Sequence, residues 1–487
     1  MGRPRSSLVA ALVTIMASVA PAHATEPFNP AHAVGAMCAG CHGDKLEGGR
    51  APPLDRASLA RFSDERLGAI LANGVPGTEM GGFADALTDD ERFRILSYLR
   101  THAADQSARP ATIADPDGQV VRSRKQAFRV EVLARGLDTP WGIAFLPDGR
   151  ALVTERRGAL RILDRRGRLL PEAVVGTPKV WVRQDAGMLD VAVPPGQRKR
   201  PWIYLAYADA LREAVGDASP PSMTVVIRGK LDGANRWTDT QELFRAPPGL
   251  YTPSGSHYGA RFLFDRAGHL FFSLGERGEM RNAQDLSTPL GKIHRVNLDG
   301  SVPRDNPFVG TPGAVPTIWS YGHRNPQGLA FDPASGLMWE TEHGPAGGDE
   351  VNVIEPGHNY GWGVASMGVQ PGITRRSAPG MDDPVAWYTP RIAPSGIAFY
   401  AGDRYPGWRG SLFIGGLAGQ QLRRLEVRGR DVVDQEVVFD RFGRVREVVT
   451  GPDGLLYVLL QIPTGGAPGK AVSDPNPGMV ARLVPLP

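Results

Sequence analysis

The stretch Gly142–Gly149 reads GIAFLPDG, in which an apolar segment runs directly into a Pro-Asp-Gly turn. A similar copy, TGPDGLLY, lies at Thr450–Tyr457, where the turn leads into a second apolar segment. Each copy therefore predicts two strands joined by a tight turn. Alternation of apolar and polar residues within the copies favours strands over helices.

The pattern recurs at intervals of about 45 to 70 residues. Its six copies start near Gly142, Gly187, Gly259, Gln327, Ser395 and Thr450. A unit of this size cannot bury both faces alone, and packing of such units in a ring is typical of propeller blades. A pair of β-sandwiches would not explain the sixfold recurrence. We therefore predict a multidomain protein, in which an all-α domain precedes an all-β six-bladed propeller at residues 127–487.

The chain has 487 residues, too many for one compact core. Residues 104–126 are rich in Ala, Asp, Ser and Pro, which indicates a surface linker between the two domains. The net charge is only +4 and the arginines are scattered. Because no basic stripe is present, nucleic acid is not an expected partner.

The N-terminus has the features of an export signal. Arg3 and Arg5 precede the apolar run Leu8–Ala20, and Ala22–Ala24 gives the small-x-small cleavage pattern. The run is shorter than the roughly 20 residues that span a bilayer. We predict that residues 1–24 are a cleaved signal peptide and that the mature protein is periplasmic, without a membrane span.

Cys38-Ala39-Gly40-Cys41-His42 is the attachment motif of a c-type haem. The thiols of Cys38 and Cys41 would add to the haem vinyl groups, and His42 would bind the iron as proximal ligand. A redox-active dithiol is the alternative, but no strand–helix pattern of the thioredoxin kind surrounds the motif. Residues 25–103 are therefore predicted to form a cytochrome c domain with one covalent haem.

The distal iron ligand is predicted largely by elimination. Between residues 25 and 125 the methionines are Met37 and Met80. Met37 adjoins a thioether cysteine on the proximal side and cannot easily reach over the ring. Met80 lies in a glycine-rich loop that could bring its sulfur to the iron. The alternatives are that Met80 only fills the core, or that His32 or His102 is the ligand.

A helix is expected after this loop. Thr88-Asp89-Asp90-Glu91 forms a capping box at its start, and the carboxylates suit the positive helix end. We expect the haem edge to be covered by its apolar residues Phe93, Ile95, Leu96 and Leu99. With the haem motif and the loop before Met80, the helix makes residues 30–101 resemble the small bacterial cytochromes c.

Loops beside the predicted inner strands carry polar side chains. His257 could act as a general base, although a structural loop histidine is the alternative. Arg324 could pair with a carboxylate, and Arg444 and Arg446 share one strand face. These three arginines indicate an anionic ligand, or else salt bridges. The loop Glu342–Glu350 offers carboxylates and exposed carbonyls that suit Ca²⁺, with a plain turn as the alternative.

Together these loops resemble the soluble pyrroloquinoline quinone (PQQ) dependent aldose dehydrogenases over residues 130–485. The most specific parts are GHRNPQG at Gly322–Gly328 and the run Glu342–Trp362. Ala283–Leu286 and Gly451–Gly454 add to the resemblance.

The resemblance implies oxidation of an aldose at its anomeric carbon to the lactone, with PQQ as hydride acceptor. Electrons would pass to the fused haem and then to a downstream acceptor, a cytochrome or the respiratory chain. His257 matches the family's base, and Glu276 matches an acidic residue that orients it. The residues matched to PQQ binding are Asp185, Gln284, Arg324, Asn325, Arg444 and Arg446. The residues matched to Ca²⁺ binding are Gly344 and Pro345, through their carbonyls, for an ion on PQQ, and Glu350 and Tyr360 for a second, structural ion.

Two positions depart from the family pattern. The family often has glutamine where this chain has Asp185, while Gln184 lies one residue earlier. Either the register shifts or a carboxylate replaces the amide. Ala418 stands where many members carry a cofactor-binding lysine. Loss of that cation should weaken PQQ binding unless another cation offsets it.

Three other functions compete with the aldose interpretation. One is a quinoprotein of other specificity, for sorbosone, another aldehyde or an oligosaccharide. Another is an electron carrier with a non-catalytic propeller, which would take up no PQQ. The third is a Ca²⁺-dependent propeller hydrolase such as a lactonase, which would act without redox change.

Overall fold

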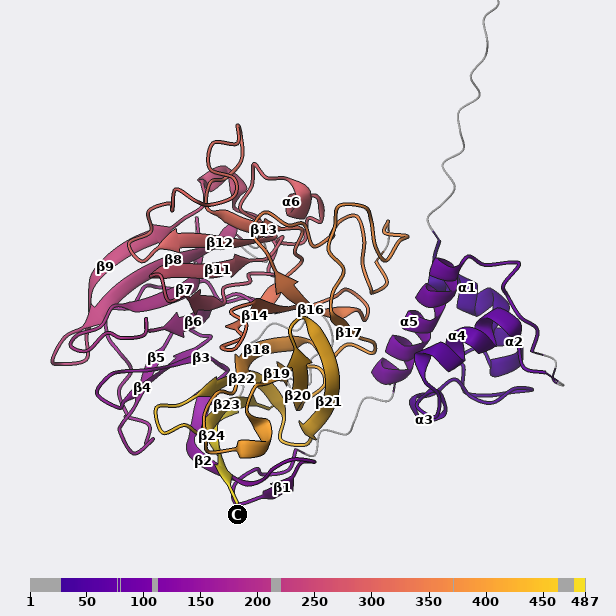
Figure 1. Cartoon of the computed structure of the whole chain (residues 1–487), viewed down its shortest axis with the longest axis horizontal. Coiled ribbons are helices and arrows are strands. Elements are labelled where there is room, and N and C mark those ends of the chain that lie inside the picture. The colour runs from indigo at the N-terminus through magenta and orange to yellow at the C-terminus, as the bar shows by residue number, and fades with distance from the viewer. Residues whose placement is uncertain are drawn as a thin grey trace, which may run out of the picture.

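The computed structural model describes residues 28–76, 78, 80–106, 113–211, 220–370, 372–462 and 477–486. They form a small helical domain beside a larger domain of antiparallel sheets (Figure 1). The predicted signal peptide, residues 1–24, lies outside the described residues. None of the described helices has the length and apolar composition needed to cross a membrane.

The helical domain packs around one apolar core. Its described helices are α1 (Pro30–Met37), α2 (Ala39–His42), α3 (Arg56–Leu59), α4 (Asp64–Asn73) and α5 (Asp89–Gln106). The predicted capping box at the start of α5 is confirmed. The backbone N–H of Glu91 donates to Oγ1 of Thr88 at 3.2 Å, and the N–H of Thr88 donates to Oε2 of Glu91 at 2.8 Å.

The larger domain consists of six antiparallel sheets. The first three contain β3 (Pro140–Phe145), β4 (Ala151–Glu155) and β5 (Leu160–Leu163); β6 (Met188–Ala192), β7 (Ile203–Ala210), β8 (Ser222–Leu231) and β9 (Trp237–Phe244); and β10 (Phe262–Phe264), β11 (His269–Leu274), β12 (Lys292–Asn297) and β13 (Ile318–Tyr321). The next two contain β14 (Pro326–Phe331), β15 (Met338–Glu342), β16 (Asp349–Ile354) and β17 (Ala386–Tyr388); and β18 (Pro394–Phe399), β19 (Ser411–Gly416), β20 (Gln421–Arg428) and β21 (Asp431–Phe439). Short helices η1 (Pro248–Leu250), α6 (Arg281–Gln284) and η2 (Pro406–Trp408) lie in the connections.

The sixth sheet joins the two ends of the domain. It contains β22 (Arg444–Thr450), β23 (Leu456–Gln461), β24 (Pro477–Pro485), β2 (Ala127–Asp138) and β1 (Val120–Arg122). β2 pairs with β24 from Phe128 opposite Pro485 to Asp138 opposite Pro477. The first strands contact one another in the closed order β3, β6, β10, β14, β18, β22 and back to β3. The predicted six-bladed propeller is therefore confirmed.

The predicted linker is shorter in the structure than in the sequence analysis. α5 continues to Gln106, and β1 already pairs with β2 of the sixth sheet. In addition, the N–H of Ala114 donates to the carbonyl of Arg441 at 3.1 Å. Residues 113–126 thus belong to the propeller, because backbone pairing, which composition does not reveal, holds them against it.

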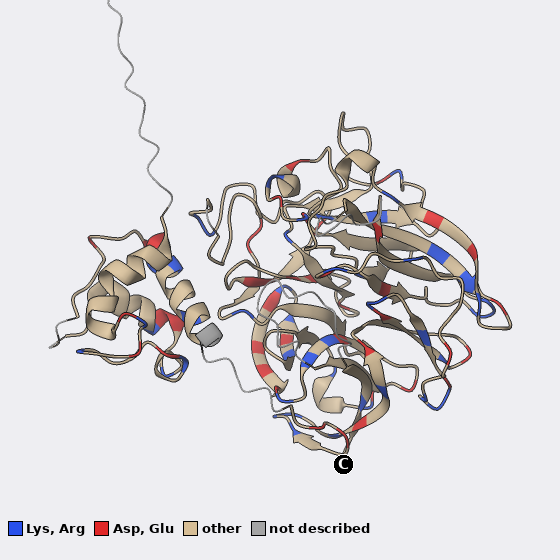
Figure 2. Cartoon of the chain, turned by 180° about the vertical axis from the view of Figure 1, so that it is seen from behind, with Lys and Arg blue, Asp and Glu red and all other residues tan. Residues whose placement is uncertain are grey.

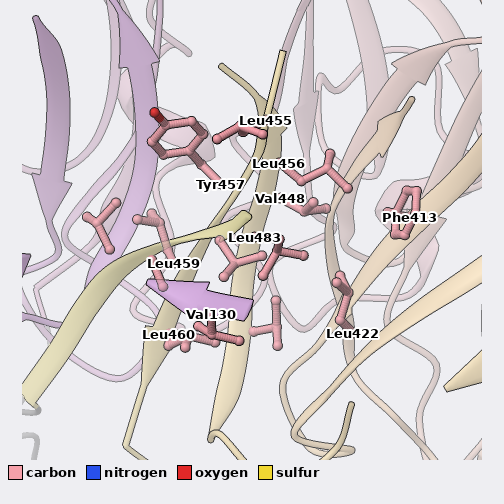
Figure 3. Packing of buried hydrophobic residues seen from close by; sticks show 14 of the residues in the cluster. Val130, Phe413, Leu422, Val448, Leu455, Leu456, Tyr457, Leu459, Leu460 and Leu483 are labelled. Atoms are coloured by element: carbon pink, nitrogen blue, oxygen red, sulfur yellow. The ribbon is translucent and has the colours of Figure 1, made fainter. Parts of the chain in front are cut away.

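Burial on both faces explains why the strands are so apolar. Each blade packs between two neighbours, and all six residues of β23 are buried. Figure 3 shows side chains of β2, β23 and β24, among them Val130, Leu460 and Leu483, interleaved in the largest core cluster. Charged residues of both signs are dispersed over the strands and loops that Figure 2 displays. Because the interior is otherwise apolar, the buried polar residues at the centre of the ring are exceptions that need a functional explanation.

Candidate active site and haem pocket

The helical domain encloses an apolar cavity of about 750 Å³, here called the haem cavity. Its lining includes Cys38, Cys41, His42 and Met80, so the structure brings the four predicted haem residues together. Both thiols are free. Nδ1 of His42 lies 2.6 Å from the carbonyl of Pro52, which leaves Nε2 for a metal. The volume and the donor set fit a covalently attached haem.

The alternative distal ligands lie elsewhere. His32 is exposed, and the ring of His102 stacks on that of Tyr98 with centroids 5.4 Å apart. Neither belongs to the lining of the haem cavity, whereas Met37 and Met80 both do. Since Met37 directly precedes the thioether Cys38, Met80 remains the predicted ligand.

The apolar face of α5 is divided between two partners. Leu96 and Leu99 line the haem cavity as expected, whereas Ile95 lies in the core of the helical domain and outside the lining of the cavity. Phe93 does not: its ring lies under the guanidinium of Arg376, 4.5 Å from the ring centroid. The expectation for Phe93 was wrong, because helical periodicity identifies an apolar face without identifying what covers it.

In the propeller, the loops before β10 and after β11 meet at the predicted base. Nδ1 of His257 lies 2.5 Å from Oε1 of Glu276, which is 1% exposed. A carboxylate can only accept, so Nδ1 carries the proton and Nε2 is left with its lone pair. A side chain added at Gly275 would fall 2.2 Å from the carbonyl oxygen of His257, so only glycine permits this approach.

The backbone of His257 is held in an unfavourable conformation. Its φ is +58°, in the left-handed region that non-glycine residues seldom adopt. The N–H of His257 donates to Oδ2 of Asp185 at 3.3 Å, which helps to hold it there. Such strain is concentrated at functional sites, where it orients a side chain.

A polar cavity, here called the arginine cavity, lies at the centre of the ring. It is lined by Trp141, Arg156, Asp185, Leu189, Tyr258, Gly259, Asn325, Gln327, His343, Leu417, Arg444 and Arg446. Nη1 of Arg446 donates to Oε1 of Gln327 at 3.1 Å, and its guanidinium lies 5.4 Å from the Trp141 ring. The predicted Asp185, Asn325, Arg444 and Arg446 therefore face one space.

The arginine cavity has an excess of positive charge. Burial, together with the neighbouring arginines, lowers the pKa of Arg446 well below its usual value, and burial lowers that of Arg444 to about 10. Burial likewise lowers the pKa of Arg156 and of Arg324, which lies outside the lining of this cavity. Buried Nε atoms of Arg156, Arg324 and Arg446 have no partner among the described residues. Donors without partners beside repelling cations are arranged for an anionic ligand.

His343 lies where all these groups converge. Burial lowers its pKa well below the usual value, and the positive charges of Arg446, Arg324 and Arg444 lower it further. Its buried Nε2 has no partner among the described residues. His343 also lines the arginine cavity, so arginines from separate parts of the chain lie near one imidazole.

The two departures from the family pattern have structural explanations. Asp185 lines the arginine cavity, whereas the side chain of Gln184 packs at Gly255. A carboxylate therefore replaces the amide, without a shift of register. Arg156, at the end of β4, supplies a cation that the sequence analysis missed. Its position in a run of charged residues, Glu155–Arg157, gave no signal.

Gln284 is not brought to the arginine cavity. Its Nε2 donates to Oδ1 of Asn359 at 3.0 Å and to the carbonyl of Trp362 at 2.8 Å. Oε1 of Gln284 accepts from Nδ2 of Asn359 at 2.8 Å. In this structure both ends of the Gln284 amide join two loops, and its assignment to cofactor binding stays a prediction.

The predicted cation ligands surround a cavity of about 10 Å³, here called the carboxylate cavity. Its lining is Arg324, Glu342, His343, Gly344, Pro345, Glu350, Tyr360, Trp362, Ala365 and Ser366. Such a volume holds one particle about the size of water. Tyr360 uses its hydroxyl to donate to the Val353 carbonyl at 2.8 Å, so only its backbone could bind an ion. Gly344, Pro345, Glu350 and Tyr360 were assigned to two ions, and the structure brings them to one cavity.

Further buried carboxylates lie behind this cavity. His323, Glu340 and Glu342 place one ligand atom each within 4.8 Å of one another. Burial and the charge of Glu342 raise the pKa of both Glu340 and Glu350 well above the usual value. Oε1 of Glu340 has no partner among the described residues. Several buried carboxylates close together, with one oxygen lacking a partner among the described residues, fit a cation at this position.

Comparison with known proteins agrees with this geometry. Residues 137–467 match the model of the Glucose / Sorbosone dehydrogenase family, and residues 27–99 match that of cbb3-type cytochrome c oxidase subunit III. The molecule is thus an oxidoreductase that combines a cytochrome c domain with a dehydrogenase propeller. The chain belongs to the glucose/sorbosone dehydrogenase family, whose model matches more than half of it.

Individual relatives cover both domains. Aldose sugar dehydrogenase YliI of Escherichia coli (strain K12) is 41% identical over 345 residues, which are 69% of this chain and 91% of the relative. The solved PQQ-bound aldose sugar dehydrogenase of Streptomyces coelicolor is similar with a TM-score of 0.58 and 28% identity, covering 76% of this chain and 99% of that chain. Cytochrome c55X of Paracoccus denitrificans (strain Pd 1222) is 34% identical over 95 residues, 20% of this chain and 92% of the relative.

Proposed function

We propose that the protein is a periplasmic quinoprotein that oxidises an aldose at its anomeric carbon to the lactone. Hydride would pass to PQQ, and electrons would then pass to the c-type haem of the same chain. The observation that carries the proposal is that Arg156, Arg444 and Arg446 line one cavity with Asp185, whose carboxylate accepts the backbone N–H of His257. The names of the relatives and the export signal, which is predicted from sequence alone, support the substrate class and the compartment.

The arginine cavity fits PQQ, because that cofactor carries several carboxylates and the cavity offers guanidinium groups whose Nε atoms, in Arg156 and Arg446, have no partner among the described residues. We assign carboxylate binding to Arg444 and Arg446, with Arg156 in place of the lysine that many relatives carry. Asn325 is held by hydrogen bonds from the N–H of Gly259 at 3.1 Å and from Nε2 of Gln327 at 3.2 Å. When bound, PQQ would supply the quinone carbonyl that accepts hydride.

His257 would act as the general base. Its Nε2 would take the proton of the anomeric hydroxyl as hydride leaves the same carbon. Glu276, hydrogen-bonded to Nδ1, would fix the tautomer and stabilise the imidazolium that forms. The cations of the arginine cavity would counter the negative charge that collects on the cofactor side.

The carboxylate cavity fits Ca²⁺. It combines the carboxylates of Glu342 and Glu350 with the backbone of Gly344 and Pro345, which are oxygen donors of the kind that Ca²⁺ prefers. The cavity shares His343 with the arginine cavity. An ion bound there would supply Lewis-acid activation next to the quinone site.

Reconstitution of the haem-loaded protein with PQQ and Ca²⁺ tests this function. A panel of aldoses, sorbosone and oligosaccharides would be added, and haem absorbance and an external dye would be followed separately. We expect an aldose to reduce both, and a chelator to abolish both. Dye reduction with an oxidised haem would contradict internal transfer. Turnover of a lactone without PQQ would contradict the dehydrogenase assignment.

A further inference from the structure

Helix α5 has one face toward the haem cavity and another toward the propeller. Leu96 and Leu99 line the haem cavity. Asp89, Asp90 and Arg94 contact propeller residues instead. α5 lies on the side of the helical domain that faces the propeller (Figure 1). One helix of the helical domain therefore lines the haem cavity and also contacts the propeller.

Arg376 of the propeller holds the first turn of α5. Its Nε donates to Oδ1 of Asp90 at 3.0 Å, and its Nη2 donates to Oδ2 of Asp89 at 3.2 Å. Its guanidinium also lies over the ring of Phe93, 4.5 Å from the centroid. Two carboxylates and an aromatic face thus fix one guanidinium, which orients α5 more closely than one ion pair could.

Arg94 provides a second contact one turn along the helix. It is 2% exposed, and its Nη1 donates to the carbonyl of Gly368 at 3.4 Å. Its Nε and Nη2 have no partner among the described residues. An arginine this deeply buried between two domains indicates a defined contact rather than a chance collision.

The segment that receives Arg94 leads directly to the carboxylate cavity. A side chain added at Gly368 would fall 2.2 Å from the carbonyl oxygen of Gly347 and 3.0 Å from Cδ of Pro345, which lines that cavity. A side chain added at Gly347 would fall 3.1 Å from Oγ1 of Thr101 on α5. Packed atoms therefore connect the loop that lines the carboxylate cavity to helix α5, which lines the haem cavity.

We propose that α5 is the docking element through which the propeller passes electrons to its own haem domain, and that Arg376 and Arg94 are the positioning residues of this contact. The inference rests on the proposed function and deepens it. Oxidation of one aldose releases two electrons and two protons. The single haem iron accepts one electron at a time, from Fe³⁺ to Fe²⁺. An external one-electron acceptor reoxidises the haem between the two transfers, and the protons leave to solvent.

The docked state is expected to be reversible. The side chains of Asp89, Asp90 and Arg376 are 81%, 38% and 34% exposed, and ion pairs with such exposure are individually weak. The covalent connection keeps the local concentration of the haem domain high, so weak contacts suffice to dock it. A repulsive charge at Arg376 should therefore undock the domain without unfolding it.

The variant Arg376→Glu tests the docking contact in the haem-loaded, PQQ-reconstituted protein. It places a carboxylate against Asp89 and Asp90, and we expect haem reduction by aldose to slow by about tenfold or more. Dye reduction should stay near the wild-type rate, because Arg376 lies outside both propeller cavities. Arg375→Glu is the matched control: Arg375 is exposed and forms no ion pair within the described residues. The double variant Asp90→Arg, Arg376→Glu should recover part of the haem reduction rate.

Small-angle X-ray scattering supplies a readout that does not depend on turnover. Arg376→Glu should increase the mean separation of the domains, and Arg375→Glu should not. Equal scattering for Arg376→Glu and wild type, or equal slowing of haem reduction in both variants, would overturn the docking role. If wild-type haem stays oxidised while dye is reduced, the proposed internal transfer fails instead. If no sugar reduces the dye, the proposed dehydrogenase activity fails, and scattering still decides the docking contact.

Discussion

Nδ1 of His257 lies 2.5 Å from Oε1 of Glu276, and the pairing of β10 with β11 brings these two residues together. In an antiparallel pair, the residues before one strand lie beside those after the other, so the two loops meet. Glu276 then assigns the proton of His257 to Nδ1 and leaves Nε2 for the substrate. The hydrogen bond between His257 and Glu276 therefore determines which nitrogen of the base faces the substrate.

Replacement of His257 should abolish turnover while leaving cofactor binding intact. His257→Ala removes the proposed base, and we expect kcat to fall by roughly 10² to 10⁴. PQQ affinity should change little, because the arginine cavity is untouched. Dye-linked kcat and a PQQ titration measure the two quantities. Retained activity would move the base elsewhere, with His343 as the next residue to test.

Replacement of Glu276 should impair His257 without removing it. In Glu276→Gln the amide can donate to Nδ1 and favour the wrong tautomer, and it cannot stabilise an imidazolium. We expect a loss in kcat of about 10² or more, with KM little changed. Glu279→Gln is the control, since the side chain of Glu279 is 59% exposed. A loss confined to KM would indicate a role in sugar binding instead.

Replacement of Arg444 should weaken PQQ binding and, at the same time, stabilise the propeller that contains no cofactor. Arg444→Met removes a carboxylate-binding group, and PQQ affinity should fall about 10- to 100-fold. The apo-protein should become more stable, because burial and the nearby Arg156 already disfavour the charge of Arg444. PQQ titration and thermal unfolding without cofactor test the pair of effects. A less stable apo-protein would show that the cavity is not electrostatically strained.

Replacement of Met80 should change the haem without affecting the propeller. Met80→Ala removes the predicted distal thioether, so the reduction potential should fall and the visible spectrum should change. Met37→Leu is the matched control, since Met37 also lines the haem cavity. Redox titration and absorbance distinguish the two variants. An unchanged spectrum in Met80→Ala would reopen the choice of ligand.

The buried His294 should make the propeller sensitive to acid. Burial lowers the pKa of His294 to about 3, against about 6.5 in an unfolded chain. Between these values the unfolded state binds more protons, so the contribution of His294 is complete above about pH 6.5 and is lost as pH falls toward 3. This contribution is on the order of 5 kcal/mol. His294→Gln should flatten the dependence of the free energy of unfolding on pH, and the exposed His32→Gln should not.

Much of the architecture follows from local sequence. The six copies of an apolar segment and a turn predict the blades. Each strand must be buried on both faces, so each strand is itself apolar. The haem motif and the capping box at Thr88 are equally local. The extent of the linker was misjudged, since β1 is defined by pairing with β2 and not by its own composition.

The candidate site was predicted less completely. His257, Glu276, Arg324, Arg444 and Arg446 lie in recognisable motifs, and the structure brings them to one place. Arg156 carries no local signal, and Gln284, which does lie in a recognisable motif, is outside the lining of the arginine cavity. Whether such a side chain faces a cavity or a neighbouring loop depends on partners that are distant in sequence.

By itself, the sequence determined the number of blades, the haem-attachment motif and the chemical types gathered at the ring centre, because burial and covalent chemistry act on short segments. Tertiary structure alone decided that Asp185 faces the arginine cavity, that Arg156 joins it and that Arg376 holds α5 against the propeller. Those outcomes depend on where ring closure and domain docking place residues far apart in the chain, and no local pattern encodes that placement.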